Sequence, residues 1–158
     1  MTNRRFAIIA IVLMTMGQSL AGQATKQTRW DYLQTKNRRF IDYQNDFKTL
    51  MQSAQECREI ISIADLYERA ETAAYSCLAA RTLLYIYDEA QCQKTERAIM
   101  WPLIKGDLEW YAGHLDNAIN AVNSDLVSAK NPAVAASGTR MKDDLRELKT
   151  FFESVRPN

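Results

Sequence analysis

The stretch TAAYSCLAARTLLYIY, residues 72–87, decides how this chain folds. Its sixteen residues include no Gly or Pro, and Arg81 is the only charged side chain among them. A helix that is apolar on nearly every side has to be covered by other elements. We therefore expect residues 66–90 to form a central helix that the rest of the chain encloses.

Upstream of this stretch, apolar residues repeat every seven positions. Residues 33–64 contain no Gly or Pro, and such a repeat is typical of a long helix with a narrow apolar seam, as in a coiled coil or an antiparallel bundle. The predicted seam consists of Leu33, Phe40, Tyr43, Phe47, Leu50, Ala54, Cys57, Ile61 and Ala64.

The turn between these two helices is expected at residues 62–65. Ser62 and Asp65 are both good helix N-caps, and Glu68 follows Asp65 at the spacing of a capping box. Ser53 and Glu56 have the same spacing. If that pair caps a helix instead, the first helix is divided near Ser53 and the chain forms five shorter helices.

A third helix is expected after Pro102. Thr95 can cap a short helical segment that Pro102 interrupts or restarts. The pattern after Pro102 has apolar residues in steps of three and four, which indicates an amphipathic helix that ends near Ala129. Its predicted apolar face is Ile104, Leu108, Tyr111, Leu115, Ile119, Val122 and Leu126.

The last helix is expected to begin at Thr139, because Asn131 and Pro132 end the third helix and residues 133–138 form a linker of small residues. Its apolar face is Met141, Leu145, Leu148, Phe152 and Val155.

Two pairs of opposite charges, four residues apart, follow in this last helix. Arg140 with Asp144, and Lys149 with Glu153, have the spacing that stabilises an exposed helix surface. The patterns together predict an all-α protein, an up-and-down antiparallel four-helix bundle with a long heptad-patterned first helix.

The N-terminus has the order of a secretory signal peptide. Two arginines precede the apolar run 6–16, and small residues follow up to Ala21. The run is too short for a bilayer core, which needs roughly 20 apolar residues. We expect a signal peptide over residues 1–21, or cleavage after Ala24, and a single helical domain over 25–158 that is periplasmic or secreted.

Cleavage would also change the net charge of the protein. The whole chain has 20 basic and 19 acidic side chains, and the signal peptide removes two arginines and no acid. The resulting net charge near −1 gives no reason to expect nucleic acid or an anionic membrane as a partner. No Cys lies near the cleavage site, so no stable lipid anchor is expected.

Three cysteines in an exported chain predict one disulfide and one spare thiol. If the chain turns near Asp65, Cys57 and Cys77 face the same helix interface at similar heights. We therefore predict a Cys57–Cys77 disulfide, which would contribute about 3 kcal/mol to stability. Cys92 is then free or links two chains in a homodimer.

One side of the third helix carries Trp110, His114 and Asn117, away from its apolar face. An exposed Trp beside His and Asn has the composition of a binding hot spot. The alternative is that this side packs on the last helix. Arg81 is a second candidate, because an unpaired buried guanidinium is costly. It either extends to the surface between helices or lines a polar pocket at the bundle centre.

No catalytic or cofactor motif is present: the chain has no Gly-rich phosphate loop, no Gly-x-Ser-x-Gly and no His-Glu-x-x-His. His114 is the only histidine, which excludes a two-histidine zinc site. A haem bundle would have to pair His114 with a methionine such as Met51, without a Cys-x-x-Cys-His attachment.

The leading hypothesis is accordingly a protein-binding module of the cell envelope, such as an inhibitor, an immunity protein or a chaperone, with no enzymatic activity and no cofactor or metal. Two alternatives stay open, a bundle that binds haem or another small ligand and a hydrolase without a recognisable motif.

Overall fold

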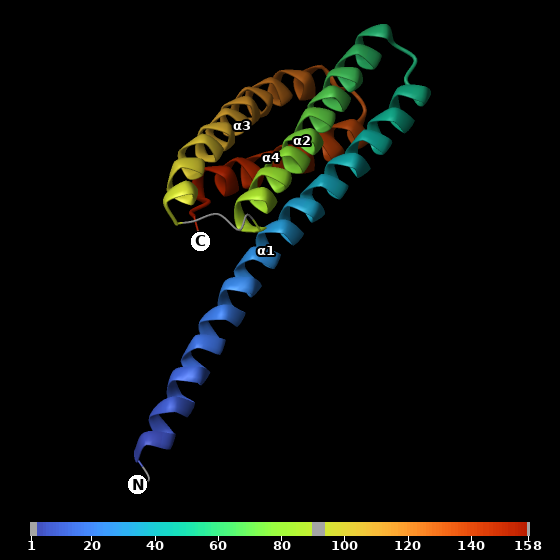
Figure 1. Cartoon of the computed structure of the whole chain (residues 1–158). Helices are drawn as coiled ribbons and strands as arrows, with labels where there is room; N and C mark the ends of the chain where they lie inside the picture. The colour runs from blue at the N-terminus through green and yellow to red at the C-terminus, as the bar shows by residue number, and fades with distance from the viewer. Residues whose placement is uncertain (1–2, 90–93, 158) are drawn as a thin grey trace.

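The computed structural model consists of four α-helices, labelled in Figure 1. It describes the backbone of residues 3–89 and 94–157 and the side chains of residues 28–89 and 95–157. No strand occurs in the described ranges. The helices are α1 (Asn3–Ser53), α2 (Cys57–Glu89), α3 (Lys94–Ser128) and α4 (Pro132–Ser154).

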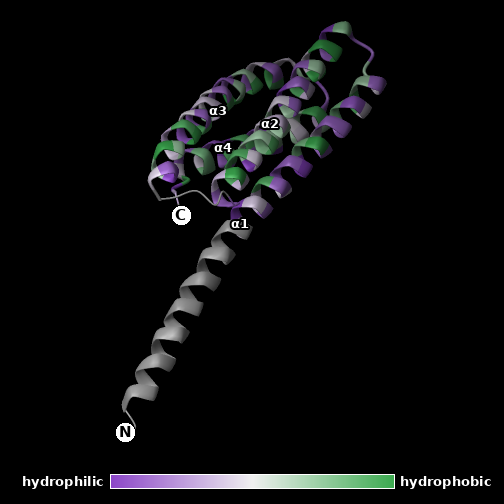
Figure 2. Ribbon diagram, in the orientation of Figure 1, coloured by the Kyte–Doolittle hydropathy of each residue, from purple (hydrophilic) through white to green (hydrophobic). Residues whose placement is uncertain are grey.

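The four helices form an up-and-down bundle, which confirms the predicted fold class. Helix α2 packs on α1 and α3, and α4 packs on α3 and α1, so that each helix contacts its two neighbours around the bundle. Helix α1 is the longest and continues beyond the other three at its N-terminal end (Figure 1). Hydrophobic and hydrophilic residues alternate along the described parts of all four helices (Figure 2).

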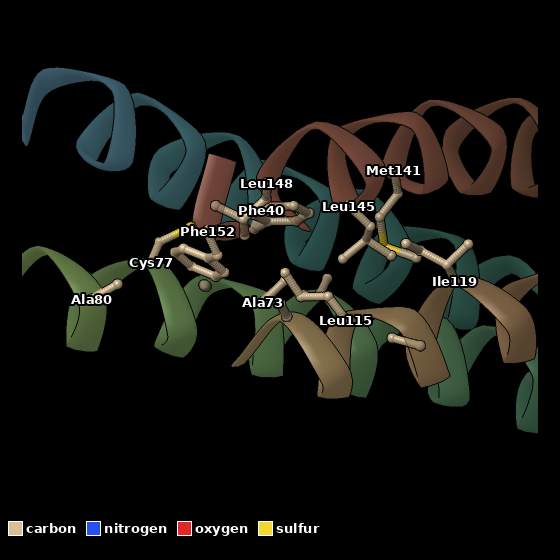
Figure 3. Close-up of a cluster of buried hydrophobic side chains, with 14 of the residues drawn as sticks. Phe40, Ala73, Cys77, Ala80, Leu115, Ile119, Met141, Leu145, Leu148 and Phe152 are labelled. Atoms are coloured by element: carbon tan, nitrogen blue, oxygen red, sulfur yellow. The ribbon is translucent and has the colours of Figure 1, made fainter. Parts of the chain in front are cut away.

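A single core is built from all four helices. Figure 3 shows Phe40 of α1, Cys77 of α2, Leu115 of α3 and Leu148 of α4 in one cluster. The apolar faces predicted for the last two helices are buried, apart from the half-buried Tyr111 and Leu126. Each large side chain that is fully buried contributes about 1.5–3 kcal/mol to folding, so this core is the main source of stability.

The turn between the first two helices lies earlier than we predicted. Helix α1 ends at Ser53 and α2 begins at Cys57, so the chain reverses at residues 54–56 and not at 62–65. Ser62 lies inside α2, where its hydroxyl donates to the carbonyl of Arg58 instead of capping a helix. The seven-residue repeat continues across the true turn, so the spacing alone could not locate the break. The break near Ser53 is real, but four helices result and not five.

The expectation that other helices enclose α2 on all sides is wrong. Its inner face has no exposed surface, and it consists of Leu66, Ala70, Ala73, Cys77 and Leu84. On the opposite side large apolar side chains face solvent. The neighbouring helices cover α2 from one side only.

Helix α3 runs through Pro102 without a break. Proline has no N–H to donate to the carbonyl of Ala98, but both residues are exposed, so water can supply the missing hydrogen bond. The separate helical segment predicted near Thr95 is therefore the first part of α3 itself.

Helix α4 begins at Pro132 and not at Thr139. The side chain of Asn131 accepts a 2.9 Å hydrogen bond from the backbone N–H of Ala133, and proline occupies the first helical position, where no N–H is needed. The Asn-Pro pair that we took as the end of the third helix thus starts the fourth.

The small residues 133–138 are helical and not a linker, and Gly138 has a packing role there. A Cβ atom at this position would lie 2.5 Å from Cδ2 of Leu126 and 3.6 Å from Cδ1 of Leu66. The missing side chain lets α4 approach α3 and α2 closely.

Among the residues that the structure describes, no helix is long and apolar enough to cross a bilayer. The predicted signal peptide lies where side chains are not described, and its cleavage stays a prediction.

Candidate functional site

The outward side of α2 carries four large apolar side chains: Tyr75, Leu78, Tyr85 and Ile86, which we call the outer face of α2. Their exposed fractions are between 50 and 66%. They occupy positions i, i+3, i+10 and i+11, which places them along one side of a helix.

The one polar residue between them, Thr82, does not interrupt the apolar character of this face. Its hydroxyl donates a 3.0 Å hydrogen bond to the carbonyl of Leu78 within the same helix. The outer face of α2 therefore offers no free side-chain donor at its centre, and its exposed surface is mainly apolar.

The two ends of the outer face of α2 differ. At the N-terminal end, Glu68 and Glu71 are exposed, and neither forms an ion pair within the described residues. At the other end the ring of Trp30 from α1 packs on Tyr85, with ring centroids 5.2 Å apart. The face is thus acidic at one end and aromatic at the other.

The predicted trio on α3 lies together on the surface. Trp110 is 58% exposed, and His114 and Asn117 are exposed as well. The rings of Trp110 and His114 are 3.7 Å apart between centroids, and Nδ1 of His114 lies 3.0 Å from the backbone oxygen of Trp110. The alternative, in which the last helix covers Trp110, does not hold.

Two further exposed residues of α3 were missed from the sequence. Ile99 and Leu103 are 66% and 70% exposed, and with Trp110 they occupy positions i, i+4 and i+11 of one helix side. This spacing is visible in the sequence, but it was overlooked because the apolar residues after Pro102 already accounted for a buried face.

Arg81 is half-buried and lies near the bundle surface instead of at its centre. With Thr82 and Tyr85 it lines a hollow of about 250 Å³. Its Nε atom is buried without a hydrogen-bond acceptor, and no ion pair of Arg81 occurs in the described part of the chain. Of the two alternatives for Arg81, the polar pocket at the bundle centre is therefore not formed, and the side chain lies at the edge of the outer face of α2.

A buried polar cluster joins α1 to α4, and sequence reasoning missed it. Asp144 was expected on the surface with Arg140, yet it is buried and accepts hydrogen bonds from Lys36 (2.7 Å) and from the hydroxyl of Tyr43 (2.6 Å). Glu147 also accepts from Lys36. Arg140 instead donates to the hydroxyl of Ser137.

The pKa values in this cluster fit a structural role. Burial lowers the pKa of Lys36, but hydrogen bonds to Asp144 and Glu147 outweigh it, and the net pKa is raised. Burial and the hydrogen bond to Asp144 raise the pKa of Tyr43 to about 12. Neither group changes its charge near neutral pH, so neither is suited to acid–base catalysis there.

The cysteines do not meet as predicted. Cys57 is the first residue of α2 and exposed, Cys77 is buried in the same helix, and both are free thiols. Twenty helical residues separate them by about 30 Å, whereas a disulfide needs Cα atoms within about 7 Å. Their predicted common interface depended on the misplaced turn. Cys92, the predicted dimer link, lies outside the described residues.

The structure does not bring together His114 and Met51, the ligand pair of the haem alternative. His114 is exposed on α3, Met51 belongs to α1, and these two helices do not contact each other within the described residues. No group of three or more His, Cys, Asp or Glu side chains that could hold a metal ion occurs in the same part of the chain.

Besides the hollow at Arg81, a groove of about 460 Å³ lies between α3 and α4. Its charged residues are paired with one another: Lys105 pairs with Glu109, and Lys149 pairs with Asp116 and Glu153. The last of these pairs is one that the sequence predicted. Two cations against three carboxylates leave this groove with a net charge of −1, and none of the five is unpaired.

No protein-family model matches this chain, and no curated protein and no solved structure matches it either. The geometry described above is therefore the basis for a functional assignment.

Proposed function

We propose that this protein is a small exported protein-binding module of the cell envelope, such as an inhibitor, an immunity protein or a chaperone-like protein, and that it binds through the outer face of α2. The supporting observation is the row of four large apolar side chains that the bundle leaves exposed on this helix. Exposed apolar patches on small proteins are typical of interaction sites.

The composition of this face favours a protein partner over a small substrate. Tyrosine is enriched in binding hot spots, where it contributes a large apolar surface and one hydroxyl group. Each square ångström of apolar surface that a partner covers contributes about 25 cal/mol. The apolar residues also follow one helix without forming an enclosed cavity, which suits a flat or helical partner surface.

The partner is expected to present an amphipathic helix. A helix that lies along the outer face of α2 would place its own apolar residues at three- and four-residue intervals against Tyr75, Leu78 and Tyr85. Basic residues at one end of that helix would lie near Glu68 and Glu71, whose carboxylates are exposed. The Trp110–His114 pair on α3 is a second surface that such a partner could contact.

The proposed export rests on the N-terminal sequence pattern, and it places the partner in the periplasm or outside the cell. The sequence lacks the three catalytic motifs named above, which agrees with a binding role but is not evidence for one.

A capture experiment with matched variants tests the binding face. Leu78→Lys adds a charge to the outer face of α2, and Val127→Lys adds the same charge to an apolar side chain on α3 that is 89% exposed. Tagged wild-type protein and both variants would be incubated with envelope extract, and bound proteins identified by mass spectrometry. We expect one partner to be retained by wild type and Val127→Lys and lost with Leu78→Lys.

Thermal melts of the three proteins must agree before the result is interpreted, because both substitutions are at exposed positions and should leave the fold intact. Equal capture by both variants would contradict the proposed face.

A further inference from the structure

Arg81 differs from every comparable cation in the bundle. Seven Lys and Arg side chains are at least partly buried in the described ranges, and six of them have an oxygen acceptor. Those six are Arg29, Lys36, Arg69, Arg97, Lys142 and Lys149. Arg81 has none in the described part of the chain. The Nε of Arg81 is buried without an acceptor, as are those of Arg29 and Arg97. Only Arg81 lacks an acceptor for its whole guanidinium in the described part of the chain, so this group is available to a ligand.

A second unsatisfied donor belongs to the same corner of the bundle. Nε1 of Trp30 is buried without a hydrogen-bond acceptor. The ring of Trp30 packs on Tyr85, and Tyr85 lines the hollow of about 250 Å³ together with Arg81 and Thr82. Tryptophan N–H groups usually find a partner when they are buried. A cation and one aromatic ring therefore line the small hollow, and a second ring, which carries an orphan N–H, packs on the first.

We propose that this corner is a binding site for a carboxylate group carried on an apolar body. The carboxylate would accept hydrogen bonds from Arg81, and its apolar body would contact the ring of Tyr85, on which Trp30 packs. A carboxylate fits better than a phosphate, because phosphate sites use clusters of cations and Arg81 is the only cation among the described lining residues.

The hollow also limits the size of the ligand. Its volume of about 250 Å³ is below the 300–1,000 Å³ that is common for drug-sized ligands. A small aromatic acid would fit, and so would one acidic side chain of a partner protein. The site does not depend on the proposed function, since either source supplies the same chemical group.

The two orphan N–H groups can be observed directly by NMR. In ¹⁵N-labelled exported protein, the Trp30 indole and Arg81 Nε–H signals would be assigned with Trp30→Phe and Arg81→Lys. One arm titrates 2-naphthoate against its uncharged twin 2-naphthylmethanol. The other arm titrates a capped helical peptide with one Glu within a leucine stripe against the same peptide with Gln in place of Glu.

We expect both signals to shift saturably with at least one carboxylate probe, and its uncharged twin to bind about tenfold more weakly or worse. A response to naphthoate would mean that the site binds a free small acid. A response to the Glu peptide alone would mean that it binds an acidic side chain of a partner protein. Arg81→Gln should abolish the response, whereas Lys48→Gln, which removes an exposed cation of α1, should not.

The proposal would be overturned if neither probe moves the two signals up to its solubility limit, if the charged and uncharged twins bind equally, or if Arg81→Gln binds as wild type does. If Arg81→Gln melts at a lower temperature than wild type, Arg81→Lys is used to test the proposal instead. This variant keeps the positive charge but loses the planar guanidinium group. It should therefore bind the carboxylate probe more weakly than wild type and more tightly than Arg81→Gln.

Discussion

Nζ of Lys36 lies 2.7 Å from Oδ1 of Asp144, and both side chains are almost completely buried between α1 and α4. The two residues are 108 positions apart in the chain, so their contact links the first helix to the last. Tyr43 donates to the other carboxylate oxygen. Every strong polar group of this cluster is thus paired, which is the condition under which buried charges are tolerated.

Asp144→Asn should strongly destabilise the protein, because it removes the buried counter-charge of Lys36, leaving it only the exposed carboxylate of Glu147, and also breaks the ion pair of Asp144 with Arg39. Breaking a buried ion pair from one side typically costs about 3–5 kcal/mol. The control is Asp143→Asn, which breaks the exposed pair with Arg146 and should cost less than about 1 kcal/mol. Urea unfolding of the two variants measures the difference. Equal losses would show that the buried pair adds nothing beyond a surface pair.

Stability should fall in alkaline solution. The pKa of Tyr43 is 10.0 in the unfolded chain and about 12 in the folded protein, so the unfolded chain loses this proton first. Stability is therefore unaffected by Tyr43 below about pH 10, falls between pH 10 and 12, and loses at most about 3 kcal/mol from this residue. Lys36 has a raised pKa as well, and its contribution is lost in the same direction as the pH rises.

The free energy of unfolding, measured by urea titration between pH 7 and 12, gives this dependence, and Tyr43→Phe provides the control. The variant has no phenol to ionise, so its stability should decline less steeply above pH 10 than that of wild type. If the two profiles run parallel, Tyr43 does not contribute to the alkaline loss.

The two described cysteines should react very differently. Cys57 is exposed, whereas burial raises the pKa of the Cys77 thiol to about 12, and only a thiolate reacts readily with alkylating reagents. Iodoacetamide at pH 8 should therefore modify Cys57 in the folded protein and Cys77 only after unfolding. Peptide mapping distinguishes the sites. If Cys57 became reactive only after reduction, it would be part of a disulfide.

The periodic part of the fold could be predicted from the sequence because burial and helical spacing are linked directly. Leu33, Phe40 and Phe47 follow a seven-residue repeat and are fully buried, and the apolar face of the last helix is buried throughout. The same logic could not find the turn at residues 54–56, since the repeat continues in phase across it. Turns are set by a few local contacts, which periodicity does not record.

The candidate site was less predictable for a different reason. The sequence marks residues 72–87 as apolar but cannot tell a helix that its own bundle covers on all sides from one that leaves an apolar side exposed. Asp144 presents the same difficulty, because its four-residue spacing from Arg140 suits a surface pair, while its actual partner Lys36 is on another helix. Contacts between distant segments decide both cases.

Two glycines should respond differently to alanine. At Gly106 of α3 a Cβ atom would meet nothing within 4 Å, so Gly106→Ala should stabilise the helix by about 0.5–1 kcal/mol. At Gly138 it would lie 2.5 Å from Cδ2 of Leu126, and overpacking of this kind typically costs about 1–3 kcal/mol. Thermal or urea unfolding should therefore rank Gly106→Ala above wild type and Gly138→Ala below Gly106→Ala. The reverse order would mean that Leu126 moves aside without cost.

Trp110→Ala should leave the fold nearly intact, because Trp110 is exposed and contacts mainly its helix neighbours His114 and Tyr111. Loss of these ring contacts should cost about 1 kcal/mol or less. Leu115→Ala on the same helix removes a fully buried side chain and should cost about 2–5 kcal/mol. Urea unfolding of both variants tests the contrast. Its result is also needed before Trp110→Ala can be used in a binding assay. If Trp110→Ala is as unstable as Leu115→Ala, the Trp110–His114 pair supports the bundle, and only the outer face of α2 is left as a contact surface for a partner.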